Sequence, residues 1–179
     1  LFYYTLGGER MKRKRGGEEL IFQEKPVAAL LVLKEIKEGA YQTLVAKRVN
    51  TTYAHTVKIM NELEHLRLIR SEQAGRVKFI KLTELGLEVA ESLERIKRIL
   101  RVCEVAREID DLYEKEVKGK LRQEIRKERV QREADKLRRR LEEFFEGDPR
   151  LAVIARRLNT RLNEVVSEAI GLPPSPAVI

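Results

Sequence analysis

The residues best suited to chemistry lie together at the start of one predicted helix. Five of them carry a hydroxyl, a phenol, an imidazole or an ammonium group: Thr51, Thr52, Tyr53, His55 and Lys58. Hydroxyl, phenol and imidazole groups can hydrogen-bond to base edges or phosphates, and lysine supplies positive charge. Such residues at a helix start either face solvent without further role or read a DNA groove. We favour the groove.

The apolar spacing around these residues predicts the helix itself. One face carries one threonine and four apolar side chains at spacings of three and four: Thr56, Ile59, Met60, Leu63 and Leu66. Thr51 or Thr52 can cap the helix, and the free backbone N–H groups there attract a phosphate. We expect the polar residues to lie on the opposite face, where packing leaves them available.

The neighbouring segments predict a compact unit around this helix. KPVAALLVLKEIKEG (25–39) predicts a helix with Pro26 in its first turn, and AYQTLVAKRVN (40–50) predicts a short second helix. After the central helix, Leu68–Glu72 and Arg76–Leu82 alternate like two strands joined by a turn at residues 73–75. Thr83 can then cap a further helix.

This order of segments resembles MarR-like and related archaeal winged-helix transcription regulators. Three stretches carry the likeness: TLVAKRVNTTYAHTVKIMNELEHLRLI, GRVKFIKLT and LTELGLEVAESL. The resemblance implies a mainly α fold with a small β-wing (α+β), in which residues 20–86 form a winged helix-turn-helix domain. Arg67 stands where the family usually has a glycine, and the wing tip Ala74-Gly75 lacks the family's acidic residue.

The resemblance also implies how this domain would bind double-stranded DNA. The recognition helix, about residues 52–66, would enter the major groove, and the wing, about residues 70–80, would lie near the minor groove. Tyr53 and His55 would reach bases, Thr52 and Lys58 phosphates, and Arg76 the minor groove. The predicted interface comprises Thr51, Thr52, Tyr53, His55, Lys58, Gln73, Arg76 and Lys78.

The net charge of +8 is unevenly distributed. Residues 1–85 hold 16 Lys and Arg against 10 Asp and Glu, whereas residues 86–179 hold 21 against 19. A basic excess favours a polyanionic partner. The flexible N-terminal tail predicted for residues 1–19 is either a DNA-binding arm or a solvated tail, and it contains Arg10, Lys12, Arg13, Lys14 and Arg15. We expect its first ten residues to be an upstream extension or an alternative start.

The second half predicts long helices that associate. Residues 87–146 form either one long charged helix or a hairpin that folds back near Gly119. Its first part has the four-three spacing of a coiled-coil seam, made by Val89, Leu93, Ile96, Leu100 and Cys103. Residues 147–171 predict an amphipathic helix with Leu151, Ile154, Leu158, Leu162 and Val165 on one face, followed by a proline-rich tail (172–179). We expect these helices to form a coiled-coil homodimer.

A catalytic or metal site is hard to build from this sequence. No glycine-rich phosphate loop is present, and His55 and His65 would lie about 15 Å apart along one helix, too far to share an ion. We therefore expect no enzyme activity, cofactor or metal. The single Cys103 fits a reducing cytoplasm and falls on the seam, where packing is favoured over oxidation sensing.

Three functions are compatible with these features. The first is a homodimeric transcription regulator, cytoplasmic and associated with the nucleoid. The second is a weakly sequence-specific nucleoid protein, and the third is a protein-interaction scaffold. The longest apolar run, Val27–Leu33, is too short to span a bilayer, so no membrane partner is expected. The abundance of Glu, Lys and Arg is typical of thermophilic proteins. The sequence does not indicate an effector.

Overall fold

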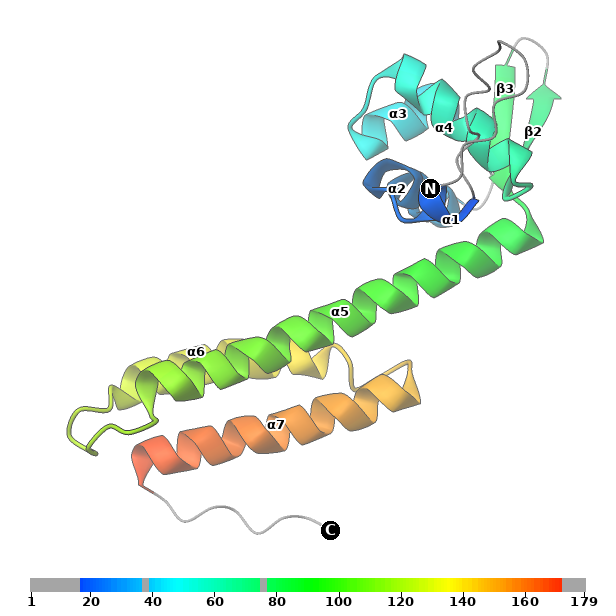
Figure 1. Ribbon diagram of the computed structural model, residues 1–179. Coiled ribbons are helices and arrows are strands. Elements are labelled where there is room, and N and C mark those ends of the chain that lie inside the picture. Colours follow the sequence, from blue (N-terminus) through cyan, green and yellow to red (C-terminus); the bar gives the residue numbers. More distant parts are fainter. Residues whose placement is uncertain (1–16, 37–38, 75–76, 172–179) are drawn as a thin grey trace, which may run out of the picture. The chain divides into compact units, whose positions relative to one another are not determined.

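The computed structural model describes residues 17–36, 39–74 and 77–171, and it divides between Glu94 and Arg95 into two compact units (Figure 1). The elements of the N-terminal unit are α1 (Gly17–Ile21), α2 (Glu24–Glu35), β1 (Ala40–Tyr41), α3 (Gln42–Val49), α4 (Tyr53–His65), β2 (Ile69–Ala74), β3 (Val77–Leu82) and the start of α5 (Glu84–Glu116). The C-terminal unit contains the rest of α5, then α6 (Lys127–Glu142) and α7 (Pro149–Ile170).

The N-terminal unit has a winged helix-turn-helix fold. Helices α2, α3 and α4 pack together, each burying an apolar side chain completely: Leu30, Val45 and Leu63. The three strands are antiparallel in the order β1-β3-β2, and Ile80 of β3 joins the same core. Helix, strand, two helices and a hairpin is the winged-helix order, so the predicted mainly α fold with a small β-wing is confirmed.

The structure corrects three details of the N-terminal unit. Ala40 and Tyr41 form strand β1, paired with Ile80 and Phe79, and are not the start of a helix. Gln73 and Ala74 belong to β2 rather than to the turn, because Gln73 pairs with Lys78 and Ala74 with Val77. Residues 17–19 belong to helix α1, so this helix extends N-terminal to the predicted domain boundary at Leu20.

Thr83 and Gly86 join the wing to α5. The hydroxyl of Thr83 accepts from the Gly86 amide at 3.0 Å, which caps α5, and donates to the Arg67 carbonyl at 2.7 Å. A Cβ atom added to Gly86 would lie 1.8 Å from the carbonyl oxygen of Leu68. The start of α5 therefore packs directly against the backbone that leads into β2, and only glycine allows this approach.

The C-terminal unit is a three-helix arrangement with its own core. Figure 1 shows α6 and α7 beside the later part of α5. The core draws Val105 and Ile109 from α5, Leu141 from α6, and Leu162 and Val165 from α7. Residues 87–146 thus form two helices rather than one, because residues 117–126 leave the helical path and Gly119 adopts a φ of +70°.

Asp148 fixes the start of α7. Its Oδ1 accepts from the backbone amides of Arg150 at 2.9 Å and Leu151 at 3.4 Å, and Pro149 occupies the first turn. Burial by itself would raise the pKa of Asp148, but these hydrogen bonds and the nearby charges of Arg95 and Arg98 lower it. The carboxylate is therefore held charged at the positive end of the helix.

Several residues of the predicted apolar faces are exposed. Ile96 is 47% exposed and Leu100 57% exposed, and the thiol of Cys103 is also exposed, so the described residues do not pack over these three seam residues. Two other seam residues are packed in the N-terminal unit, where Leu93 is buried and Val89 lies against the core. In the C-terminal unit the core side of α5 begins at Val102. On α7, Ile154 is 44% exposed and the buried face is completed by small residues such as Ala155.

No helix in the described part of the chain has the length and apolar character required to cross a bilayer.

Candidate nucleic-acid interface

A tight turn places α4 directly after α3. Asn50 has a left-handed backbone, with a φ of +53°, and asparagine is one of the few residues that adopt this conformation readily. The amide of Thr51 donates to the Ala46 carbonyl at 3.1 Å, which closes the end of α3. Thr51 therefore stabilises the turn through its backbone amide, and the next residue, Thr52, is the N-cap of α4.

Thr52 uses both of its oxygen atoms to start α4. Its side-chain oxygen accepts from the amide of His55 at 3.3 Å, and its carbonyl accepts from the amide of Thr56 at 2.9 Å. Of the two proposed caps, the structure selects Thr52. The amides of Tyr53 and Ala54 have no helical partner and lie at the positive end of the helix dipole.

The buried face of α4 is narrow and leaves most of the helix exposed. Thr56, Ile59, Met60 and Leu63 are the buried residues, and they pack against the rest of the N-terminal unit. His55 and Lys58 are exposed, and neither forms an ion pair among the described residues. Imidazole and ammonium groups are thus available to a partner.

Tyr53 is exposed but already hydrogen-bonded. Its side chain is 54% exposed, and its hydroxyl donates to Oε1 of Gln42 at 2.9 Å. Gln42 is the first residue of α3, so this bond ties the N-termini of α3 and α4 together. Gln42 was not predicted as an interface residue, because its role depends on two helices meeting.

The wing contributes fewer free groups than predicted. Nζ of Lys78 lies 3.3 Å from Oε2 of Glu64, so the charge of this lysine is partly neutralised by α4. A hydrogen bond from the side chain of Ser71 lowers the pKa of Glu64, against the opposing effect of burial and with further help from Lys78. Gln73 is exposed in β2. Arg76 lies outside the described residues.

Most of the basic excess of residues 1–85 comes from residues outside the described ranges. Across 17–36, 39–74 and 77–94, the N-terminal unit holds nine Lys and Arg against 11 Asp and Glu. The positive excess comes mainly from residues 10–15, which lie outside the described residues. Any binding by the described surface of α4 must therefore depend on local side chains rather than on the overall charge of the unit.

Two exposed residues of α4 were missed by the sequence analysis. Ala54 and Asn61 lie on the same side of the helix as Lys58, at spacings of four and three. Their spacing from Lys58 is visible in the sequence, but neither residue carries the charge or the aromatic ring that marks the predicted interface residues near the N-terminus. His65 is exposed at the other end of α4.

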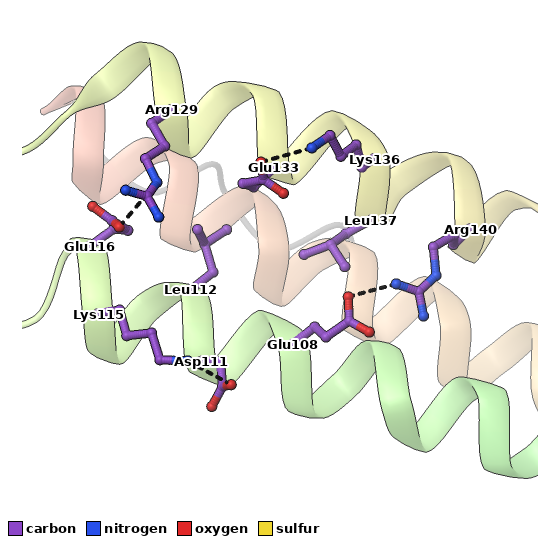
Figure 2. A pocket seen from close by; sticks show the side chains of 10 residues that line it. All are labelled: Glu108, Asp111, Leu112, Lys115, Glu116, Arg129, Glu133, Lys136, Leu137 and Arg140. Atoms are coloured by element: carbon purple, nitrogen blue, oxygen red, sulfur yellow. Dashed lines mark hydrogen bonds and ion pairs between the residues drawn. The ribbon is translucent and has the colours of Figure 1, made fainter.

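A second candidate site is a shallow groove of about 370 Å³ between α5 and α6 in the C-terminal unit (Figure 2). Two ion pairs cross it: Glu108 with Arg140 at 2.6 Å, and Glu116 with Arg129 at 3.3 Å. The remaining charges pair within each helix, as Asp111–Lys115 and Glu133–Lys136. Leu112 and Leu137 lie between them. The ion pairs that cross the groove join α5 to α6. Because its charged side chains are paired with one another, few of them are available to bind a ligand.

The described residues provide no metal site. Among them, no group of three or more His, Cys, Asp or Glu side chains is placed to hold an ion.

Comparisons with known proteins find partial similarities. No protein-family model matches the chain. An uncharacterized protein of Archaeoglobus fulgidus is 27% identical over 85 residues, which is 46% of this chain and 90% of that protein. The solved structure of AF1382 from the same organism is 26% identical with a TM-score of 0.43, and covers 46% of this chain and 93% of that one.

Two further solved structures are similar over part of the chain. MepR, a transcription regulator of the Staphylococcus aureus multidrug efflux pump MepA, is 25% identical with a TM-score of 0.41, over 44% of this chain and 60% of that one. ZitR of Lactococcus lactis is 21% identical with a TM-score of 0.41, over 57% and 68%. The similarity to these proteins thus extends over about half of the chain.

Proposed function

We propose that this chain binds double-stranded DNA and regulates transcription, with α4 in the major groove and the β2–β3 hairpin near the minor groove. One observation carries the proposal: the outer face of α4 is exposed over its whole length, directly after a tight turn from α3. An α-helix fits the major groove, and exposed polar side chains on it can hydrogen-bond to base edges.

The charge of the described part of the N-terminal unit favours a regulator over a general coat protein. Coating of any duplex depends on many phosphate contacts, and therefore on an excess of positive charge. The described part of this unit has more acidic than basic residues. Recognition by hydrogen bonds from a few side chains suits such a surface better.

Binding to a labelled duplex, followed by fluorescence anisotropy at several salt concentrations, tests the proposal. We expect affinity to fall as salt rises, because each phosphate contact releases counterions. Lys58→Ala should weaken binding to every duplex and reduce the slope of log K against log salt by about 0.9 if Lys58 contacts one phosphate.

Lys97→Ala is the matched control, because Lys97 is an exposed lysine on α5 without an ion pair among the described residues. It should leave both affinity and slope unchanged. If no duplex is retained near physiological salt, the chain is not a DNA-binding protein, and the scaffold function gains support.

We also propose that the chain forms a homodimer through the exposed apolar face of α5. Ile96, Ile99 and Leu100 are each at least 40% exposed, with Cys103 beside them, and this face points away from the core side of the helix. Apolar side chains at spacings of three and four typify helix pairs. A dimer would present two copies of α4 to two half-sites.

Light scattering after size-exclusion chromatography tests the dimer. The wild type should have about twice the 20.8 kDa mass of one chain, and Leu100→Glu should shift it to the single-chain mass. Leu121→Glu is the control, because Leu121 is exposed outside this face. A wild-type protein that elutes as a monomer at micromolar concentration would contradict the proposal.

A further inference from the structure

Four side chains of α4 point away from its buried face. With 3.6 residues per turn, Ala54, Lys58, Asn61 and His65 point within about 30° of the direction opposite the centre of that face. All four are exposed, and His65 is the last residue of the helix. Tyr53 and His55 point about 90–110° away from that outward direction, so they lie on the flanks of the helix. The predicted base-reading residues are therefore not the ones that project furthest from the domain.

The outward side chains that precede His65 are free of internal partners in the described part of the chain. Neither Asn61 nor Lys58 makes a hydrogen bond or an ion pair there through its side chain. Tyr53, by contrast, is bound to Gln42 at 2.9 Å. The amide of Asn61 thus retains both a donor and an acceptor, as recognition of a base edge requires.

We infer that Ala54, Lys58 and Asn61 form the base-reading stripe of α4, and that Asn61 recognises adenine while Ala54 contacts a thymine methyl group. This inference rests on the proposed function. A paired donor and acceptor match N7 and the N6 amino group of adenine, and an exposed methyl group matches the thymine methyl. The target site accordingly contains A·T pairs at both positions.

The dimensions of the stripe agree with this assignment. From Ala54 to Asn61 the helix advances seven residues, or about 10 Å at 1.5 Å per residue. Base pairs are stacked about 3.4 Å apart, so the stripe spans roughly three steps of the duplex. Lys58, between the other two residues, reaches either guanine or a phosphate in the same stretch.

The experiment selects target sequences from duplexes with a randomised core and then exchanges single base pairs. The wild type should yield a consensus with at least one A·T pair whose replacement by G·C lowers affinity about tenfold. Asn61→Ala should abolish that discrimination while changing affinity for a random duplex by less than about twofold. Ala54→Gly should likewise reduce the discrimination between A·T and G·C at a second position, by a smaller factor.

Gln123→Ala serves as the matched control, since Gln123 carries an exposed amide in the segment between α5 and α6. It should keep the wild-type consensus. If wild type and Asn61→Ala select the same consensus, or the wild type selects none, the reading stripe is wrong although DNA binding stands. If no duplex is retained at all, the proposed function and the stripe fail together. Circular dichroism of each variant establishes that α4 remains folded.

Discussion

Gly86→Ala should lower the free energy of unfolding of the N-terminal unit by about 3 kcal/mol or more. The added Cβ would lie 1.8 Å from the Leu68 carbonyl oxygen, and 3.2 Å from its Cα, where no side chain can rotate away. Removing this steric clash requires α5 to move away from the backbone segment that follows α4. That movement would also break the bonds of Thr83 to the Arg67 and Leu68 carbonyls.

Urea unfolding followed by circular dichroism measures this effect. Glu88→Ala is the control, because Glu88 is exposed on the same helix and should change the unfolding free energy by no more than about 0.5 kcal/mol. If Gly86→Ala unfolds at the wild-type urea concentration, the close approach of α5 to Leu68 does not exist in solution.

Leu141→Ala should destabilise the C-terminal unit by about 3 kcal/mol. Leu141 is completely buried, and α6 buries only three other residues. Each of these four side chains therefore makes a large share of the contact between α6 and the helices α5 and α7. The alanine would leave a cavity that neighbouring helices can fill only in part.

The matched control for this change is Leu121→Ala. Leu121 is 62% exposed in the segment that links α5 to α6, so its truncation removes almost no buried surface. We expect its unfolding free energy to remain within about 0.5 kcal/mol of the wild type. Equal losses for the two variants would mean that α6 is not packed as described. Hydrogen exchange of the α6 amides would show whether the loss is confined to this unit.

The sequence predicted the winged-helix elements well, because their apolar spacing and their caps are local. Thr52 caps α4 and Thr83 caps α5, and each cap is a hydrogen bond to the backbone amide three residues further along the chain. Arg67 was noted as occupying a glycine position, and its φ is +58°, the conformation for which glycine is favoured.

Features that depend on tertiary contacts could not be predicted in the same way. Strand β1 has two residues, too few for any alternation, and exists because β3 pairs with it. Spacing of three and four also leaves the direction of a helix face uncertain by a large angle, so Ile154 was placed in a core to which Ala155 contributes instead. The outward position of Asn61 could have been predicted from the apolar spacing of α4, whereas the absence of a partner for its amide among the described residues is known only from the structure.

The ion pairs that join α5 to α6 have a consequence for heat tolerance. The cost of removing charged groups from water falls as temperature rises, whereas apolar burial gains little more. Glu108–Arg140 and Glu116–Arg129 therefore contribute relatively more to the attachment of α6 in hot solution than in cold. The attachment of α6, which buries four side chains, therefore depends less on apolar contact alone as temperature rises.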